Sequence, residues 1–230
     1  MNGTRAAGHV REQGSVLAQI ERKTLIWLAE RLPRSVNSDH LTILGLSAMA
    51  AAGSALWASH WLAVAPFLAI TALAVNWFGD SLDGTVARVR NQQRPMYGFY
   101  VDHVIDVVGA FFLFGGLGLS PFMSPLLALV LLVAYLMVSA ELYLATHACG
   151  VFRLDMFKIG PTELRILLAV GILYAVYKPV VVIGGGEYLL FDVGGLVATV
   201  GMFGALIAST VRNTMTLYRA EPIPVAQEQC

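Results

Sequence analysis

The chain has 230 residues, of which 57% are hydrophobic and only 13% are charged, and its formal net charge is zero. Its mean hydropathy of +0.68 is far above that of a soluble globular domain, so the composition predicts an integral membrane protein. A neutral chain offers no electrostatic argument for a nucleic-acid partner. The two cysteines, Cys149 and Cys230, match neither a disulfide framework nor the paired spacing of a zinc site.

The N-terminal segment predicts an amphipathic helix. The first forty residues contain no apolar core ahead of a small-residue cleavage site, so we expect no removable signal peptide. Between Ser15 and Leu32, apolar residues recur at helical spacing among charged ones, and Pro33 ends the pattern. A helix of this kind is too charged to span a bilayer and fits the inner membrane surface, although a helix packed on a soluble neighbour gives the same pattern.

Six later stretches are apolar and long enough to cross a bilayer, because about 20 helical residues span a hydrocarbon core of roughly 30 Å. The fold predicted is therefore an all-α integral membrane protein with six transmembrane helices preceded by an interfacial amphipathic helix. We expect a cytoplasmic N-terminus with the juxtamembrane helix (residues 1–36), a six-helix membrane domain (37–215) and a cytoplasmic tail (216–230). The predicted spans are Leu41–Ser59, Trp61–Gly79, Phe99–Ser120, Ser124–Cys149, Thr162–Val182 and Tyr188–Val211.

Basic residues indicate how these spans are oriented. With the N-terminus inside, six spans place every lysine and arginine except Lys178 on the cytoplasmic side. The positive-inside rule therefore predicts that both termini are cytoplasmic. In the last span, Gly194, Gly195, Ala198 and Gly201 are small enough for close helix packing, and we expect a homodimer with this span as a candidate interface.

A polar segment interrupts the apolar pattern between the second and third spans. Asp102 and Asp106 lie one turn apart at the inner end of the third span. A short loop joins the two helices, which predicts antiparallel neighbours whose four carboxylates converge at the membrane boundary. At about 100° per residue, five residues share one helix face at the inner end of the second span: Asp80, Asp83, Gly84, Ala87 and Arg88.

Four converging carboxylates require positive charge between them. At an effective dielectric constant near 20, each close pair of like charges costs about 4 kcal/mol at 4 Å. Hard oxygen ligands without a cysteine or a histidine pair favour Mg²⁺, Mn²⁺ or Ca²⁺ over zinc. We therefore expect two divalent cations, with Mg²⁺ preferred and Mn²⁺ as the alternative.

The residues beside these aspartates favour a phosphate ligand. Gly84 and Ala87 leave the helix surface bare, so a ring or a phosphate can approach the backbone. Arg88, one turn beyond Gly84, offers the fork geometry that binds phosphate oxygens. Aspartates that bind metals, an open surface and an arginine together suit in-line displacement at phosphorus.

The complete string resembles the signature of the CDP-alcohol phosphatidyltransferase family, with every defining position filled. The resemblance extends to six spans, a cytoplasmic active site and a preceding amphipathic helix, and so covers most of the chain. The string reads Asp80, x2, Asp83, Gly84, x2, Ala87, Arg88, x9, Gly98, x3, Asp102, x3, Asp106.

The resemblance implies a role for each aspartate. Asp80, Asp83 and Asp102 would hold the metals. Asp106 would be a further metal contact and the catalytic base that takes the proton of the attacking hydroxyl. The acceptor oxygen would attack the phosphorus on the alcohol side of the CDP linkage, and CMP would depart.

The resemblance also implies a nucleotide and diphosphate site. The family commonly has Pro-Asn, x, Leu, Thr before the first span, and Thr42 keeps this register. Asp39 departs from the pattern, because it replaces a neutral amide near the expected nucleotide. Arg88 would contact the diphosphate, and the other nucleotide-site residues would be Asp83, Gly84, Ala87, Gly98 and Thr42.

Further polar residues have more than one interpretation. Glu141, a buried acid midway along the fourth span, fits a hydrogen bond to a neighbouring helix better than a place in an acceptor pocket. His103 points about 100° away from Asp102, which favours packing over a ligand role. Four basic residues explained by topology are also candidates to bind a phosphate on the acceptor: Arg153, Lys158, Arg165 and Arg212.

The leading hypothesis is a membrane transferase of phospholipid biosynthesis that uses a CDP-alcohol, an acceptor alcohol or lipid, and membrane lipids as its partners. Either CDP-diacylglycerol reacts with a polar alcohol such as inositol phosphate, glycerol phosphate or serine, or a CDP-aminoalcohol reacts with a lipid hydroxyl. The alternative is a divalent-cation transporter or a non-catalytic membrane scaffold, which would bind metal without releasing CMP. We expect the protein in a prokaryotic inner membrane.

Overall fold

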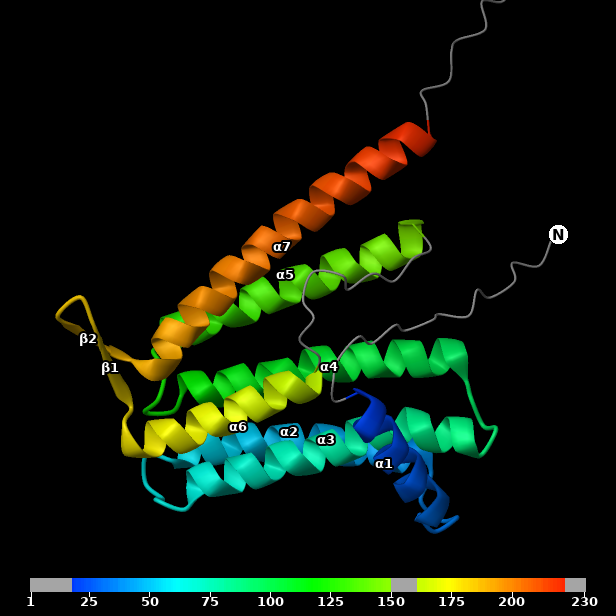
Figure 1. Cartoon of the computed structure of the whole chain (residues 1–230), viewed down its shortest axis with the longest axis horizontal. Coiled ribbons are helices and arrows are strands. Elements are labelled where there is room, and N and C mark those ends of the chain that lie inside the picture. Colours follow the sequence, from blue (N-terminus) through cyan, green and yellow to red (C-terminus); the bar gives the residue numbers. More distant parts are fainter. Residues whose placement is uncertain (1–17, 150–160, 222–230) are drawn as a thin grey trace, which may run out of the picture.

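The computed structural model describes residues 18–149 and 161–221. In these residues the chain forms seven helices and one antiparallel hairpin (Figure 1). The helices are α1 (Ala18–Arg31), α2 (Ser38–Ala58), α3 (Ala65–Val89), α4 (Pro95–Gly118), α5 (Pro125–Cys149), α6 (Pro161–Tyr177) and α7 (Leu190–Ala220), and the strands are β1 (Val180–Ile183) and β2 (Gly186–Leu189).

Residues at the helix starts explain where several helices begin. The Asn37 side chain accepts a hydrogen bond from the His40 backbone, and the His40 side chain accepts one from the Asn37 backbone, which forms a capping box at the start of α2. Pro95 and Pro161 stand at the first positions of α4 and α6, where a missing backbone N–H costs nothing.

The lengths of the apolar helices agree with a membrane protein. Within the described part of the chain, α2, α4, α5 and α7 are each long and apolar enough to cross a bilayer. The helix α3 does not meet the same criterion because polar residues occupy its second half, and α6 has only 17 residues. The six-span count therefore stays a prediction.

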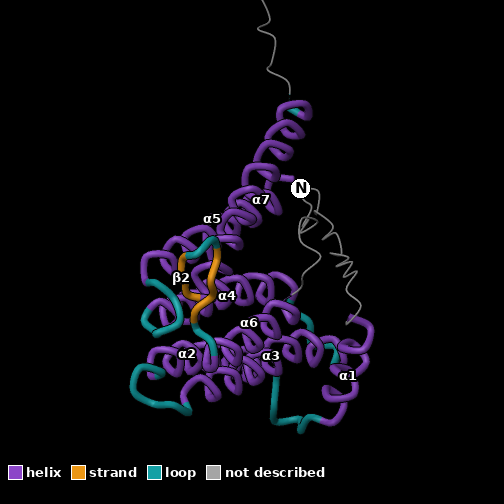
Figure 2. The backbone as a smooth tube through the Cα atoms, turned by 60° about the vertical axis from the view of Figure 1, so that its left-hand side comes forward, coloured by secondary structure: helices purple, strands orange, loops and turns teal. Residues whose placement is uncertain are grey.

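The hairpin corrects the predicted end of the fifth span. The spacing predicts helix to Val182, but α6 ends at Tyr177 and Pro179 precedes β1. The two strands form a hairpin (Figure 2). Gly184 and Gly185 in its turn have positive φ, a conformation that suits glycine. The last helix is also longer than predicted, because α7 continues past Val211 to Ala220.

The helix α2 lies at the centre of the N-terminal bundle, since α3 and α4 both pack directly on it. The helices α3 and α4 run antiparallel, as predicted (Figure 1), although each of them packs mainly on α2. A Cβ on Gly79 of α3 would lie 2.6 Å from the Leu41 carbonyl oxygen, and a Cβ on Gly116 of α4 would clash with the backbone of Gly53. These glycines let two helices approach the backbone of α2, which a short loop alone does not determine.

The N-terminal helix α1 crosses the end of α3. Its residues Leu25 and Ala29 are buried against Leu82 and Val86 of α3. Arg90, just after α3, donates hydrogen bonds of 2.5 and 3.0 Å to the carbonyl oxygens of Val36 and Leu32 in the connection to α2. The predicted helix is thus present and docked on protein, while its place at a membrane surface stays a prediction.

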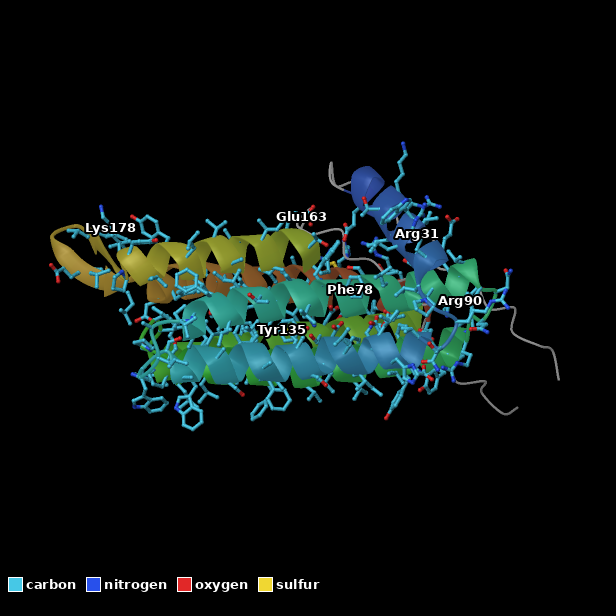
Figure 3. All side chains as sticks on the ribbon, turned by 90° about the horizontal axis from the view of Figure 1, so that it is seen from below. Arg31, Phe78, Arg90, Tyr135, Glu163 and Lys178 are labelled. Carbon is cyan, nitrogen blue, oxygen red and sulfur yellow. The ribbon has the colours of Figure 1, made fainter. Side chains whose placement is uncertain are left out.

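Labelled basic residues mark the two ends of the helices. Figure 3 shows Lys178 beside the hairpin at one end and Arg31 and Arg90 at the opposite end. The starts of α2, α4 and α6 and the ends of α3 and α5 all lie toward the end with Arg31 and Arg90 (Figure 1). We call this end, which also contains the predicted site, the basic end.

Candidate metal centre and active site

Three aspartates from two helices meet near the basic end. Asp80 is on α3, and Asp102 and Asp106 are one turn apart on α4. Each offers a carboxylate oxygen, and these three oxygens lie within 4.8 Å of one another. Asp80 is half-buried, whereas Asp102 and Asp106 are exposed. The structure therefore brings together three of the four aspartates that the sequence singles out.

The donor set fits a hard divalent cation. Carboxylate oxygens are the ligands that Mg²⁺ and Mn²⁺ prefer, and the three oxygens are close enough to share one ion. Exposure of two carboxylates also leaves room for a phosphate oxygen as a further ligand. The chemistry of Asp80, Asp102 and Asp106 thus agrees with the predicted cofactor type.

Asp83 makes different contacts. Its Oδ2 accepts a 2.7 Å hydrogen bond from Thr42 Oγ1 of α2, and its Oδ1 accepts one of 2.5 Å from the Gly84 backbone. Thr42 is therefore close to the acidic face, as the register of the motif predicts. A metal role for Asp83 stays a prediction, because its oxygens are not part of the three-aspartate group.

Arg88, Gly84 and Ala87 of the motif lie along α3, and Gly98 lies near the start of α4. Arg88 Nη2 donates a 3.0 Å hydrogen bond to Thr85 Oγ1, and its Nη1 would lie 3.3 Å from a Cβ placed on Gly84. The guanidinium thus lies directly over Gly84, where a side chain would push it away. Ala87 is half-buried beside it, and a Cβ on Gly98 would meet no atom within 4 Å.

Arg165 contacts the acidic cluster from α6. Its Nη2 donates a 2.5 Å hydrogen bond to Asp80 Oδ2, and its Nε donates one of 2.8 Å to Asn76 Oδ1. Arg165 was predicted as a candidate for binding the acceptor, and the structure places it against a predicted metal ligand instead of at a separate site. Its role toward an acceptor stays a prediction.

Sequence reasoning missed Asn76. This residue is buried at 5% exposure and lies one turn before Asp80 on α3. Its Nδ2 donates a 2.9 Å hydrogen bond to the Gly45 carbonyl oxygen of α2. An amide inside an apolar stretch, four residues ahead of an aspartate, was the available signal, because residues i and i+4 share a helix face.

Asp39, which differs from the family pattern, is paired with Arg94. Asp39 Oδ1 accepts a 2.5 Å hydrogen bond from Arg94, and this contact raises the pKa of the Arg94 guanidinium above its usual value. An open hollow of about 300 Å³ is lined by this pair together with Asn37, Ser38 and Gln92. An adjoining hollow of about 630 Å³ is lined by Arg34, Asn37, Arg90 and Gln92, and neither lining includes the three clustered aspartates.

The remaining candidates fall outside the cluster. Arg153 and Lys158 lie outside the described residues, and Arg212 is exposed on α7. Glu141 accepts hydrogen bonds of 2.9 and 2.8 Å from Ser209 and Asn213 of α7, which confirms the expected bond to a neighbouring helix.

His103 packs in the way that its direction on the helix predicts. Its ring centroid lies 4.1 Å from that of Phe99 and 4.7 Å from that of Tyr143. Its Nδ1 lies 2.6 Å from the Phe99 carbonyl oxygen. These contacts support a packing role.

The comparison with known families gives an independent result. A family model described as CDP-alcohol phosphatidyltransferase matches residues 37–212, which is more than half of the chain. No curated protein matches the chain. The matched segment includes α2, both helices that carry the acidic cluster, and Arg165.

Proposed function

This chain belongs to the CDP-alcohol phosphatidyltransferase family, and we propose that it moves a substituted phosphate group from a CDP-alcohol to an acceptor hydroxyl, releasing CMP. The observation that carries this proposal is the close approach of carboxylate oxygens from Asp80, Asp102 and Asp106 within 4.8 Å of one another. Divalent cations held by these residues, with Asp83 as a fourth candidate, would neutralise the diphosphate and make its phosphorus more electrophilic.

The side chains around the cluster fit the remaining steps. Asp106 is exposed, so it can reach an acceptor hydroxyl and take its proton as a general base. The acceptor oxygen then bonds to the phosphorus on the alcohol side of the diphosphate, while the bond to the CMP oxygen breaks. Arg88, positioned over Gly84, would hold the departing phosphate through paired N–H donors.

Thr42 and Asp83 would form part of the nucleotide site. The Thr42 hydroxyl orients the Asp83 carboxylate through their 2.7 Å hydrogen bond. Gly84, Ala87 and Gly98 add no bulk beside it, which suits the approach of a flat base or a diphosphate. The hollow at Asp39 and Arg94 lies at the start of α2, the same helix that supplies Thr42.

We place all six helices α2 to α7 across the membrane, with the basic end in the cytoplasm. The helix α3 has 25 residues, enough to cross the hydrocarbon core at about 1.5 Å per residue. Its polar second half would then lie at the inner boundary, where substrates with a charged head group meet the cytoplasm. A homodimer in a prokaryotic inner membrane completes this proposal.

The test is a direct assay of CMP release. Purified protein with Mg²⁺ is incubated with labelled CDP-diacylglycerol or CDP-aminoalcohols, each against polar alcohols and diacylglycerol as acceptors. We expect CMP and one new phospholipid from a single donor class, with both lost when the divalent cation is chelated. Cation binding without CMP release from any pair would contradict the transferase and support a transporter or a scaffold.

A further inference from the structure

Arg165 and Asp80 form an ion pair that is largely shielded from solvent. The guanidinium Nη2 lies 2.5 Å from Asp80 Oδ2, and the two side chains are only 16% and 27% exposed. Charges in such surroundings interact more strongly than a pair on an open surface. The pair joins α6 to α3, two helices that also pack against each other.

Asn76 fixes the direction of the Arg165 guanidinium. Its Nδ2 is committed to the Gly45 carbonyl oxygen, so its Oδ1 faces Arg165 and accepts the Nε hydrogen bond of 2.8 Å. A Cβ on Gly45 would lie 3.7 Å from Asn76 Nδ2 and 3.4 Å from the Asp80 backbone nitrogen, so α2 closely supports this arrangement. Asn76, itself bonded to Gly45, thus holds the guanidinium against the Asp80 carboxylate.

The same carboxylate belongs to the three-aspartate cluster. A divalent cation bound by Asp80, Asp102 and Asp106 would use the same carboxylate that Arg165 contacts. The cation and the guanidinium would also repel each other. We propose that Arg165, anchored by Asn76, is a built-in counter-ion of the cation site, and that a divalent cation binds in competition with it. This inference rests on the cation site of the proposed function and adds two residues that set its affinity.

A counter-ion of this kind has a clear physical use. Without a cation, three nearby carboxylates repel one another, and a fixed positive charge keeps Asp80 in place between turnovers. When a cation takes over that charge balance, the guanidinium is released from Asp80. It is then free to bind an anionic group on the acceptor, which reconciles its present contact with the role predicted from the sequence.

Manganese binding to the purified full-length protein, without any substrate, tests the proposal. Free Mn²⁺ is followed by its electron paramagnetic resonance signal in the wild type and in Arg165→Gln and Arg165→Lys. Removing the positive charge should tighten Mn²⁺ binding by about tenfold or more, because the competing cation is gone. The Arg165→Lys variant keeps the charge but cannot make both contacts of the guanidinium, so it should tighten Mn²⁺ binding by less than Arg165→Gln does.

Asn76→Leu tests the anchor. An unanchored guanidinium is a weaker competitor, so Asn76→Leu should tighten Mn²⁺ binding by less than Arg165→Gln does. The double variant should bind no more tightly than Arg165→Gln alone, because Asn76 acts through Arg165. Asn213→Leu is the control, since it also removes a side-chain amide that bonds to a neighbouring helix, there to Glu141, and it should leave the affinity unchanged.

The results separate this inference from the proposed function. Unchanged or weaker Mn²⁺ binding in Arg165→Gln overturns the counter-ion, even where the wild type binds Mn²⁺ and releases CMP. Additive effects of Asn76→Leu and Arg165→Gln overturn the anchoring role of Asn76. A wild-type protein that binds no Mn²⁺ would overturn the cation site itself, and with it both proposals.

Discussion

At the scale of single residues, Asp106 and Asp102 lie one turn apart on α4 with similar exposure, yet we assign them different roles. We expect Asp106→Asn to lower the rate of CMP release by at least about a hundredfold, because the amide cannot accept the proton of the acceptor hydroxyl. Mn²⁺ binding should be largely kept, since the Asn side chain retains an amide oxygen that can bind the cation beside Asp80 and Asp102. Glu30→Gln on α1, an exposed acid, serves as the control. Full activity in Asp106→Asn would show that another group is the base.

The Thr42 hydroxyl offers a second test at this scale. Thr42→Val keeps the shape of the side chain but removes the 2.7 Å hydrogen bond to Asp83. We expect kcat/KM for the CDP-alcohol to fall about tenfold, the effect of losing one hydrogen bond to a charged group. Thr71→Val is the matched control, because the Thr71 hydroxyl donates to the Phe67 carbonyl oxygen of its own helix. Equal kinetics for the two variants would argue against a role for Thr42 in the nucleotide site.

At the scale of helices, Gly79 sets how closely α2 and α3 approach beside Asp80. A Cβ at this position would lie 2.6 Å from the Leu41 carbonyl oxygen and 2.7 Å from the Gly45 nitrogen, and backbone atoms cannot move aside cheaply. We expect Gly79→Ala to lower the free energy of unfolding by about 1–3 kcal/mol and to weaken Mn²⁺ binding. Thermal unfolding in detergent measures the first effect. Gly115→Ala, where a Cβ meets no neighbour within 4 Å, should show neither effect.

One carboxylate links α1 to both α3 and α6. Glu21 Oε1 accepts hydrogen bonds of 2.9 Å from Trp77 Nε1 on α3 and of 2.7 Å from Thr162 Oγ1 in the first turn of α6. We expect Glu21→Ala to weaken the docking of α1 by about 2 kcal/mol. Trypsin should then cut more than tenfold faster at Arg22 and Lys23. Cleavage at the wild-type rate would mean that the apolar contacts of Leu25 and Ala29 hold α1 by themselves.

The sequence was sufficient to predict where the helices lie along the chain, but it did not predict how they pack against one another. Long apolar stretches and prolines locate α2, α4 and α5 within a few residues, because these signals are local along the chain. Helix packing depends on glycines such as Gly79 and Gly116, whose facing partners on α2 cannot be read from one sequence. The hairpin was missed because Val180–Ile183 is as apolar as a membrane helix.

The candidate site shows the same division. Asp80, Asp102 and Asp106 were predicted to converge, since the four-residue spacing fixes a helix face and the loop brings the two helix ends together. The contact between Arg165 and Asp80 joins residues 85 positions apart, and no local pattern reveals it. Asn76 was readable as a polar residue on the right face, but its partners on α2 and α6 were not.

At the scale of the whole molecule, the distribution of basic residues predicts that the basic end faces the cytoplasm. Cysteines introduced at Gly185 in the hairpin and at Gln92 in the α3–α4 loop, in a background without the natural cysteines, report the two ends. An impermeant maleimide added to intact cells should label position 185 and should label position 92 only after the membrane is opened. Labelling of both positions from the same side would contradict the proposed arrangement of six spans.

The central claim is that Asp80, Asp102 and Asp106 together hold a divalent cation at the inner end of the bundle. The most direct measurement is an anomalous-scattering map from crystals of the protein grown with Mn²⁺ and a CDP-alcohol. The account predicts a manganese peak coordinated by all three carboxylates and by the diphosphate, with Arg165 moved off Asp80. A map with the diphosphate bound elsewhere, or without manganese between these three side chains, would contradict it.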